Sequence, residues 1–293
     1  FFFKPHPANP DSSTSRGLGD VYKRQVQDAI SRYLASEYNV IMIVMVRYWF
    51  FAFFVILLVL KTQGGIQKAF HTSQPFLQFF RGTLLALEVC VIVLAFTYLG
   101  LVESHAIFAC YPLLAAALSV PILGEKVGWR RWVAIGIGCI GVLIILQPGI
   151  KIFSPYALLA IASALMFALY GLLTRYAAIK DDATTSFFWT GVSGAIIMTC
   201  LGFWYWEPLA IQDYSWMILL CLTAVLGHYL LIKCYEAAEV SVVQPFAYFQ
   251  LLFITIIGVL IFNENLDLRI LIGASIIIGS GLFTLYRENK SSP

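Results

Sequence analysis

Residues 39–60 read NVIMIVMVRYWFFAFFVILLVL, an apolar stretch with a single charged side chain, Arg47. A helix rises about 1.5 Å per residue, so this stretch can cross the roughly 30 Å hydrocarbon core of a bilayer. Eight more apolar runs follow, near residues 82–101, 104–124, 132–147, 155–175, 184–204, 215–234, 240–262 and 269–286. The sequence therefore predicts nine membrane-spanning helices joined by short polar loops.

The composition supports a membrane protein. Of 293 residues, 60% are hydrophobic and 12% are charged, and the mean hydropathy is +0.83. A soluble domain carries about 25% charged residues, so this chain could not cover its apolar surface in water. The net charge of +3 is spread singly between apolar runs, which argues against a nucleic-acid partner. We expect a small-molecule solute and membrane lipid as partners. The sequence leaves undecided whether the protein forms a homodimer.

Two halves of the chain resemble each other. A shift of 139 residues lays Leu123-Gly124-Glu125 on Phe262-Asn263-Glu264, and Arg130 on Arg269. Because the two glutamates recur at equivalent positions, we expect them to cap or pair at helix ends near these arginines. The repeat predicts two copies of one five-helix unit, which requires one helix more than the nine apolar runs provide.

The missing helix should lie at the N-terminus. Thr174-Arg175-Tyr176 ends the helix expected at 155–175 and matches Ser31-Arg32-Tyr33, so the first helix should end near Arg32. Residues 12–25 are too polar to span a bilayer, and their last six, DVYKRQ, look like a translated transposon end from sequencing-library preparation. We expect residues 1–25 to be a non-native leader that replaces most of the first helix; the alternative is an ordinary disordered leader. The repeats then cover residues 26–147 and 150–288.

An odd number of helices per repeat places the two halves in opposite orientations. With the C-terminus inside, three basic residues face outward, namely Arg32, Lys151 and Arg269, against eleven on the inner side. The eleven are Lys61, Lys68, Arg81, Lys126, Arg130, Arg131, Arg175, Lys180, Lys233, Arg287 and Lys290. This bias predicts a multi-pass protein of the inner (plasma) membrane with a cytoplasmic C-terminus. The fold class is an all-α polytopic membrane protein with two inverted five-helix repeats.

These features together resemble the EamA-type permeases of the drug/metabolite transporter superfamily. The resemblance rests on the two five-helix repeats, on the turns at residues 123–125 and 263–264, and on Leu146-Gln147-Pro148-Gly149 closing the first half. It covers residues 26–288 and implies ten spans, cytoplasmic termini and alternating access around a central cavity. It also implies metabolites such as amino acids, nucleosides or vitamins as substrates. Residues 28–33, DAISRY, are similar to members that import riboflavin or S-adenosylmethionine.

Three ionisable residues lie near the middle of predicted spans. They are Arg47, Glu88 and His228. A charge at that depth costs roughly 3 kcal/mol or more unless it is paired or hydrated, so such residues normally face the bundle interior. The repeat shift carries Glu88 onto Gly227, next to His228, which places these polar groups at similar depths in opposed halves. Inverted-repeat transporters bind their substrates at this position.

We therefore predict a central substrate site formed by Arg47, Glu88, Tyr111, His228 and Tyr248. Arg47 would bind an anionic or carbonyl group, and the two tyrosines would stack on a planar or apolar part of the solute. Glu88 is the predicted proton carrier, because burial favours the protonated form of a carboxyl group. The alternative is a structural ion pair between Arg47 and Glu88 that locks two helices.

Other motifs predict packing and not chemistry. Residues 136–141 fit the GxGxxG pattern but lie inside an apolar helix without a preceding strand, so they predict close helix packing. The six cysteines stand singly, which argues against a metal site or disulfides. Without HExxH, GxSxG or clustered carboxylates, we expect no catalytic residues, no cofactor and no enzymatic activity. A membrane-embedded enzyme and a structural membrane protein remain the alternatives to a secondary transporter driven by a proton gradient or by exchange.

Overall fold

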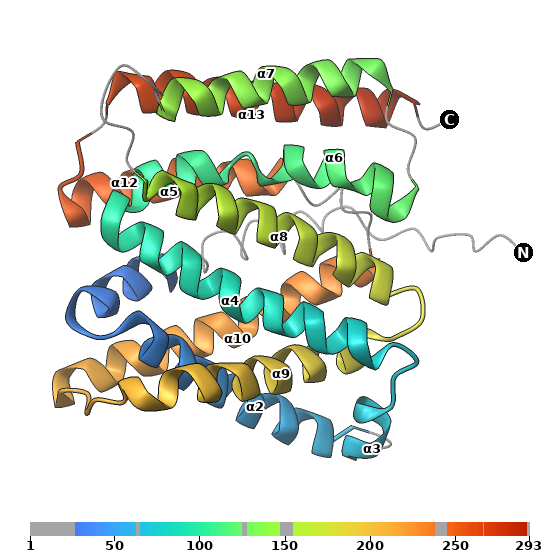
Figure 1. Cartoon of the computed structure of the whole chain (residues 1–293), viewed down its shortest axis with the longest axis vertical. Coiled ribbons are helices and arrows are strands. Elements are labelled where there is room, and N and C mark those ends of the chain that lie inside the picture. Colours follow the sequence, from blue (N-terminus) through green and yellow to red (C-terminus); the bar gives the residue numbers. More distant parts are fainter. Residues whose placement is uncertain are drawn as a thin grey trace, which may run out of the picture.

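The computed structural model describes residues 27–62, 65–124, 128–146, 155–237, 245–265 and 267–291. These residues form helices and connecting turns, with no strand among them (Figure 1). The predicted leader, residues 1–25, lies outside the described residues. Residues 27–37 are helical and precede the first long helix.

The helices match the predicted spans closely. Their bounds are α2 Val40–Leu60, α3 Gly65–Phe70, α4 Pro75–Leu99, α5 Leu101–Phe108, α6 Tyr111–Leu123, α7 Trp129–Leu146, α8 Ala157–Ala177, α9 Ala183–Gly202, α10 Tyr214–Ala237, α12 Pro245–Phe262 and α13 Leu268–Ser291. Within the described residues, six stretches are long and apolar enough to cross a membrane, and three shorter apolar helices accompany them. The prediction of an all-α polytopic membrane protein is confirmed.

Helix α4 begins earlier than predicted. We expected a span at 82–101 after a polar loop, but the helix starts at Pro75, and the loop itself contains α3. Proline suits the first turn of a helix because its missing N–H needs no partner there. Gln78 and Arg81 make this end of α4 look polar in the sequence, yet both side chains are fully buried. The prediction was wrong here because it equated polar residues with exposed loops.

Arg81 is buried because its guanidinium group is fully engaged. It donates to Oε1 of Gln78 at 2.8 Å, to the backbone oxygen of Ser186 at 2.6 Å, to Thr174 at 3.1 Å and to the hydroxyl of Tyr170 at 3.3 Å. These partners lie on α4, α8 and α9. A buried charge is tolerated only when such bonds compensate its loss of hydration. The network therefore clamps these three helices together.

The predicted span at 104–124 is broken into α5 and α6. Residues 109 and 110 form a turn between them, and Pro112 follows in the first turn of α6. Proline has no N–H to donate to the carbonyl group of Phe108, and its ring clashes with that group, which favours a break in the helix at this point. Together α5 and α6 still count as one membrane-length stretch, Leu101–Ile122.

Small residues bring α7 and α13 into close contact. These helices lie side by side at one edge of the bundle in Figure 1, with α2 and α9 towards the opposite edge and α4 and α8 between. A Cβ atom at Gly141 would lie 2.8 Å from the backbone oxygen of Gly273, and one at Gly273 would lie 2.6 Å from that of Gly141. The close packing predicted for residues 136–141 is confirmed at Gly141, whereas a Cβ atom at Gly136 would meet no atom within 4 Å.

The end of the 27–37 helix is anchored to the start of α10. Tyr33 and Tyr38 donate to the two carboxylate oxygens of Asp213, at 3.2 and 2.7 Å. The hydrogen bond to Asp213 raises the pKa of the Tyr33 hydroxyl. Tyr38 also accepts the backbone N–H of Ala210 at 2.9 Å. The first described helix is therefore fixed at this end, next to the start of α2.

Candidate functional site

A small cavity is lined by residues from both halves of the chain. Its volume is about 60 Å³. The polar residues that line it are Gln27, Asp28, Arg47, Glu88, His105 and His228, and the others are Val89, Ile92, Val93, Phe96, Phe108, Phe167 and Gly227. The structure thus brings together the three mid-span ionisable residues that the sequence singled out. It also places Gly227, the repeat equivalent of Glu88, at the same cavity.

Arg47 reaches the cavity from α2 and contacts His228 of α10. The Nη2 atom of Arg47 lies 3.1 Å from Nε2 of His228, and both side chains are buried. Arginine offers only N–H donors, so Nε2 of His228 must accept, which makes the ring neutral with its proton on Nδ1. That ring stacks on Phe51, with the ring centroids 5.7 Å apart. The Nε atom of Arg47 is also buried, and no described residue accepts its proton.

Glu88 reaches the cavity from α4. Ser163 of α8 donates its hydroxyl to Oε1 of Glu88 at 2.6 Å, and Glu88 is only 4% exposed. This bond joins a helix of the first half to a helix of the second. The predicted alternative, a direct lock between Arg47 and Glu88, stays a prediction. What the geometry provides is a buried cation and a buried carboxyl group on one cavity.

The predicted aromatic walls fall in different places. Tyr111 does not line the cavity; its ring packs behind Phe108 and Phe167, at centroid distances of 5.1 and 5.0 Å. The phenylalanines form the wall, and Tyr111 supports it. Tyr248 belongs to α12, and its side chain lies outside the described residues. Its predicted stacking role therefore stays a prediction.

A second polar pair, not predicted from the sequence, lies at the cavity. Nε2 of His105 lies 3.0 Å from Oδ2 of Asp28, and Nδ1 of the same ring donates to the backbone oxygen of Leu101 at 2.9 Å. The His105 ring stacks on Phe96, with centroids 4.8 Å apart and planes 7° from parallel. A histidine near the start of an apolar span was the available signal. It was passed over because its partner is 77 residues away in sequence.

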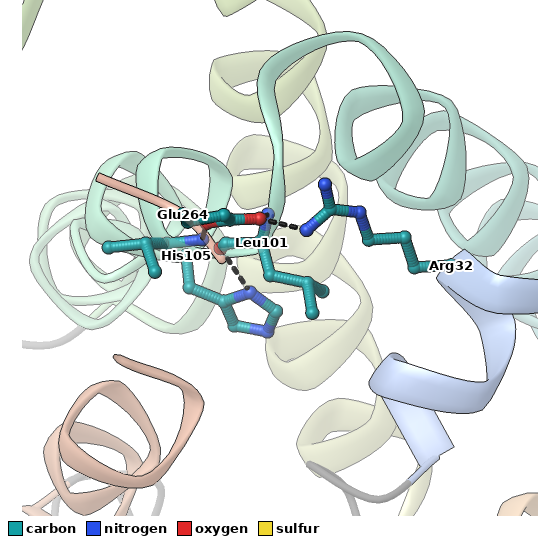
Figure 2. Close-up of polar contacts among 5 residues, drawn as sticks. Arg32, Leu101, His105 and Glu264 are labelled. Atoms are coloured by element: carbon teal, nitrogen blue, oxygen red, sulfur yellow. Dashed lines mark hydrogen bonds and ion pairs between the residues drawn. The ribbon is translucent and has the colours of Figure 1, made fainter. Parts of the chain in front are cut away.

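Glu264 contacts α5 one helical turn before His105. It joins three segments, namely its own loop, α5 and the 27–37 helix (Figure 2). Its carboxylate accepts the backbone N–H groups of Leu101 at 2.7 Å and Val102 at 2.8 Å, and it forms an ion pair with Arg32. Gly100 has φ of +89°, and a Cβ atom there would lie 2.8 Å from the Glu264 carboxylate. Glu264 thus caps the start of α5 and ties it to the 27–37 helix. We call these contacts the Glu264 clamp.

The expectation that Glu264 caps or pairs at a helix end is confirmed, although its contacts are with α5 and Arg32. Glu264 does cap a helix, but it pairs with Arg32, and Arg269 bonds to Asp267 at 2.7 Å and approaches Glu103 to 3.9 Å. The capped helix is α5, which is distant in sequence. Glu125 and the side chain of Arg130 lie outside the described residues.

Comparison with known proteins gives the class of protein. A family model described as the EamA-like transporter family matches residues 27–147 and 154–286. An S-adenosylmethionine uptake transporter from Rickettsia prowazekii (strain Madrid E) is 27% identical over 266 residues, which covers 91% of this chain and 90% of that protein. A riboflavin transporter from Vibrio cholerae serotype O1 (strain ATCC 39315 / El Tor Inaba N16961) is 31% identical over 245 residues, covering 82% and 81%.

The fold comparison agrees with these matches. One solved crystal structure superposes with a TM-score of 0.67 over 97% of this chain and 100% of that one, at 15% sequence identity, which shows a shared fold. The resemblance found in the sequence is confirmed, because both halves match one family and the relatives align over most of their length. The chain therefore belongs to the EamA-like transporter family and is a multi-pass membrane transporter of small metabolites, not an enzyme.

Proposed function

We propose that this protein carries S-adenosylmethionine, or a metabolite of the same chemistry, across the inner membrane by alternating access. One observation carries the proposal: a buried cation, a buried carboxyl group and a phenylalanine wall line the same cavity between the halves. S-adenosylmethionine combines a carboxylate, an ammonium group, a sulfonium centre and a planar adenine. The carboxylate, the ammonium group and the adenine each have a chemical complement in the cavity.

The cavity residues can be matched to this solute one by one. Arg47 has a buried Nε–H that no described residue accepts, and it can donate to the carboxylate of the solute. Glu88 can accept from the ammonium group. Phe108 and Phe167 can stack on adenine, backed by Tyr111, and we keep Tyr248 and His228 as further residues of this site.

A riboflavin-like solute is the second candidate, since one relative is named for riboflavin transport. Its flavin ring would suit the aromatic wall equally well. It carries no charged group, however, and would leave Arg47 and Glu88 buried against an uncharged ligand. A zwitterionic or cationic solute can place an opposite charge next to one or both of these side chains, in addition to the partners that they have within the protein. The charges of the cavity therefore favour a zwitterionic or cationic metabolite.

The size of the cavity bears on the transport cycle. A site for a drug-sized ligand usually measures about 300–1,000 Å³, whereas a single water molecule needs about 10–15 Å³ of cavity. The cavity of about 60 Å³ holds a few waters but no such metabolite. Helices around it must therefore separate to admit the solute, as alternating access requires. The break between α5 and α6 beside Phe108 is one place where the bundle can open.

The remaining sequence predictions complete the proposal. We propose that the C-terminus is cytoplasmic, that the loop at residues 263–267 faces outward, and that 26–147 and 150–288 are the two repeats. The positive-inside bias of the basic residues supports this orientation. The cavity is lined within one chain, so the proposed site does not need the homodimer that the sequence left open.

Exchange transport in proteoliposomes tests the function. Purified protein should exchange internal for external radiolabelled S-adenosylmethionine, and Arg47→Ala should lower the exchange rate at subsaturating solute. One lost charge-assisted hydrogen bond of about 1.5–3 kcal/mol corresponds to roughly 10- to 100-fold in affinity. Lys61→Ala, which removes an exposed cation at the end of the same helix, is the control. Absence of exchange with the wild type, or normal exchange with Arg47→Ala, would reject the proposal.

A further inference from the structure

The hydrogen-bond partners of Asp28 and His105 determine how many protons this pair holds. Nδ1 of His105 faces the backbone oxygen of Leu101 at 2.9 Å, and a carbonyl oxygen can only accept. Nδ1 must therefore carry a proton. Nε2 faces a carboxylate oxygen of Asp28 at 3.0 Å. A hydrogen bond can form there only if one further proton lies between the two atoms, either on the ring or on the carboxyl group.

The two possible forms of the pair share one consequence. An imidazolium facing a carboxylate and a neutral imidazole facing a carboxylic acid have the same overall charge and the same number of protons. Removing that single proton leaves the lone pair of Nε2 against an ionised oxygen. The attraction then becomes a repulsion, and the two side chains must separate or admit water.

The surroundings allow the proton to enter and leave through the transport pathway. The His105 and Asp28 side chains are 3% and 15% exposed, and both line the central cavity. Other charged and titratable groups line the same cavity. Across the cavity these are Arg47 on α2, Glu88 on α4 and His228 on α10.

The remaining charged groups lie nearer the helix ends. Arg32 follows Asp28 by one turn, and Glu264 caps the turn before His105. Glu103, on the same helix as His105, faces Arg269 at 3.9 Å. The pair is thus the titratable contact that joins the 27–37 helix directly to α5.

We propose that the Asp28–His105 pair is the proton-binding site that couples this transporter to a transmembrane pH gradient. This inference rests on the proposed transport function. When the pair holds its proton, the 27–37 helix stays bound to α5 and the cavity is closed. When the proton passes to water on the side to which the cavity opens, the two segments separate. Glu88, the proton carrier expected from sequence, instead binds the solute.

The Asp28→Asn variant keeps the hydrogen bond to His105 but cannot release a proton. The asparagine amide can donate to Nε2 of a neutral His105, so the hydrogen bond persists, but no proton can be released from this position. Glu103→Gln on α5 is the matched control, since it neutralises a nearby carboxylate that is absent from the cavity lining.

Transport assays distinguish this pair from Glu88. In proteoliposomes with labelled S-adenosylmethionine, the wild type should show exchange at equal pH and accumulation under a pH gradient, up to about tenfold per pH unit for one coupled proton. Asp28→Asn holds the closed contact permanently, so it should slow exchange and abolish the dependence of uptake on the pH gradient, whereas Glu103→Gln should keep both. Glu88→Gln should lower both while preserving their ratio. Loss of accumulation in Glu88→Gln alone, with Asp28→Asn normal, would overturn the proposal.

A second measurement does not depend on the solute. Protein containing ¹⁵N-labelled histidine, held in nanodiscs, should show a His105 Nε2 resonance, assigned by its absence in His105→Gln, that moves when the pH is changed. The same resonance should be independent of pH in Asp28→Asn. A pH-independent wild-type resonance would refute the proton site. If S-adenosylmethionine is not exchanged but this resonance titrates as expected, the proposed solute fails and the proton site stands.

Discussion

Replacing Glu264 with glutamine should open the cavity from the outer face. The Glu264 carboxylate accepts the N–H groups of Leu101 and Val102 through its two oxygens and also pairs with Arg32. Glutamine has one carbonyl oxygen, and its amide nitrogen is a donor. Glu264→Gln therefore leaves one backbone N–H facing another donor and removes the negative charge that holds Arg32.

The size of the effect follows from these contacts. A hydrogen bond to a charged group contributes about 1.5–3 kcal/mol. The Arg32 and Glu264 side chains are 21% and 14% exposed, so their ion pair contributes at most about 1 kcal/mol more. The closed form should thus lose about 2–4 kcal/mol, which corresponds to roughly a 30- to 1,000-fold change in the ratio of closed to open molecules.

Accessibility of the cavity to a thiol reagent measures this change. Ile92 lines the cavity, so Ile92→Cys in a background without native cysteines reports its opening. A membrane-impermeant maleimide added from outside should label the Glu264→Gln protein at least about 30-fold faster than its parent, because the labelling rate follows the open population. Glu103→Gln, which removes a carboxylate on α5 that is not part of the clamp, should leave the rate unchanged. An unchanged rate in Glu264→Gln would refute the clamp, and faster labelling from the cytoplasmic side alone would refute the proposed orientation.

Three further predictions address the rest of the bundle. Arg81→Ala should destabilise the protein by about 3–5 kcal/mol, measured as a fall of roughly 10 °C in the unfolding midpoint, because it empties a buried hydrogen-bond network. Gly141→Leu should lower the midpoint by separating α7 from the Gly273 backbone, whereas Gly136→Ala should not, since nothing lies within 4 Å of that Cβ position. A reporter active only outside the cytoplasm, fused after Arg287, should be silent; strong activity would contradict the inverted-repeat orientation.

The sequence predicted the helices well because membranes impose a simple rule. An apolar run of about 20 residues must become a helix when no water can satisfy its backbone. The rule fails where polar residues are buried by partners from elsewhere in the chain. Gln78 and Arg81 look like loop residues, yet Ser186 and Thr174 satisfy them inside the bundle. Such pairings depend on tertiary contacts that hydropathy does not encode.

The same distinction explains the site. Arg47, Glu88 and His228 could be predicted to meet because a charge in the middle of a span must face the bundle interior. Their convergence on one cavity agrees with that reasoning. Asp28 and His105 could not be predicted in this way. They lie near helix ends, and only the fold shows that their side chains pair. Tyr111 was assigned by residue type, and the structure places two phenylalanines between it and the cavity.

The distribution of contacts indicates which part of the bundle moves. The α4, α8 and α9 helices are held by the fully satisfied Arg81 network, and α7 is packed on α13 through glycine backbones. By contrast, the contacts that join the 27–37 helix to the start of α5 include the Glu264 clamp and the Asp28–His105 pair, which depend on charge or on a proton. Contacts of this kind can be broken by a change of charge or by loss of a proton, whereas the packing of glycine backbones cannot. We therefore expect the transport cycle to separate these two segments, with the 27–37 helix pivoting at its Asp213 anchor, while the clamped helices move as a unit.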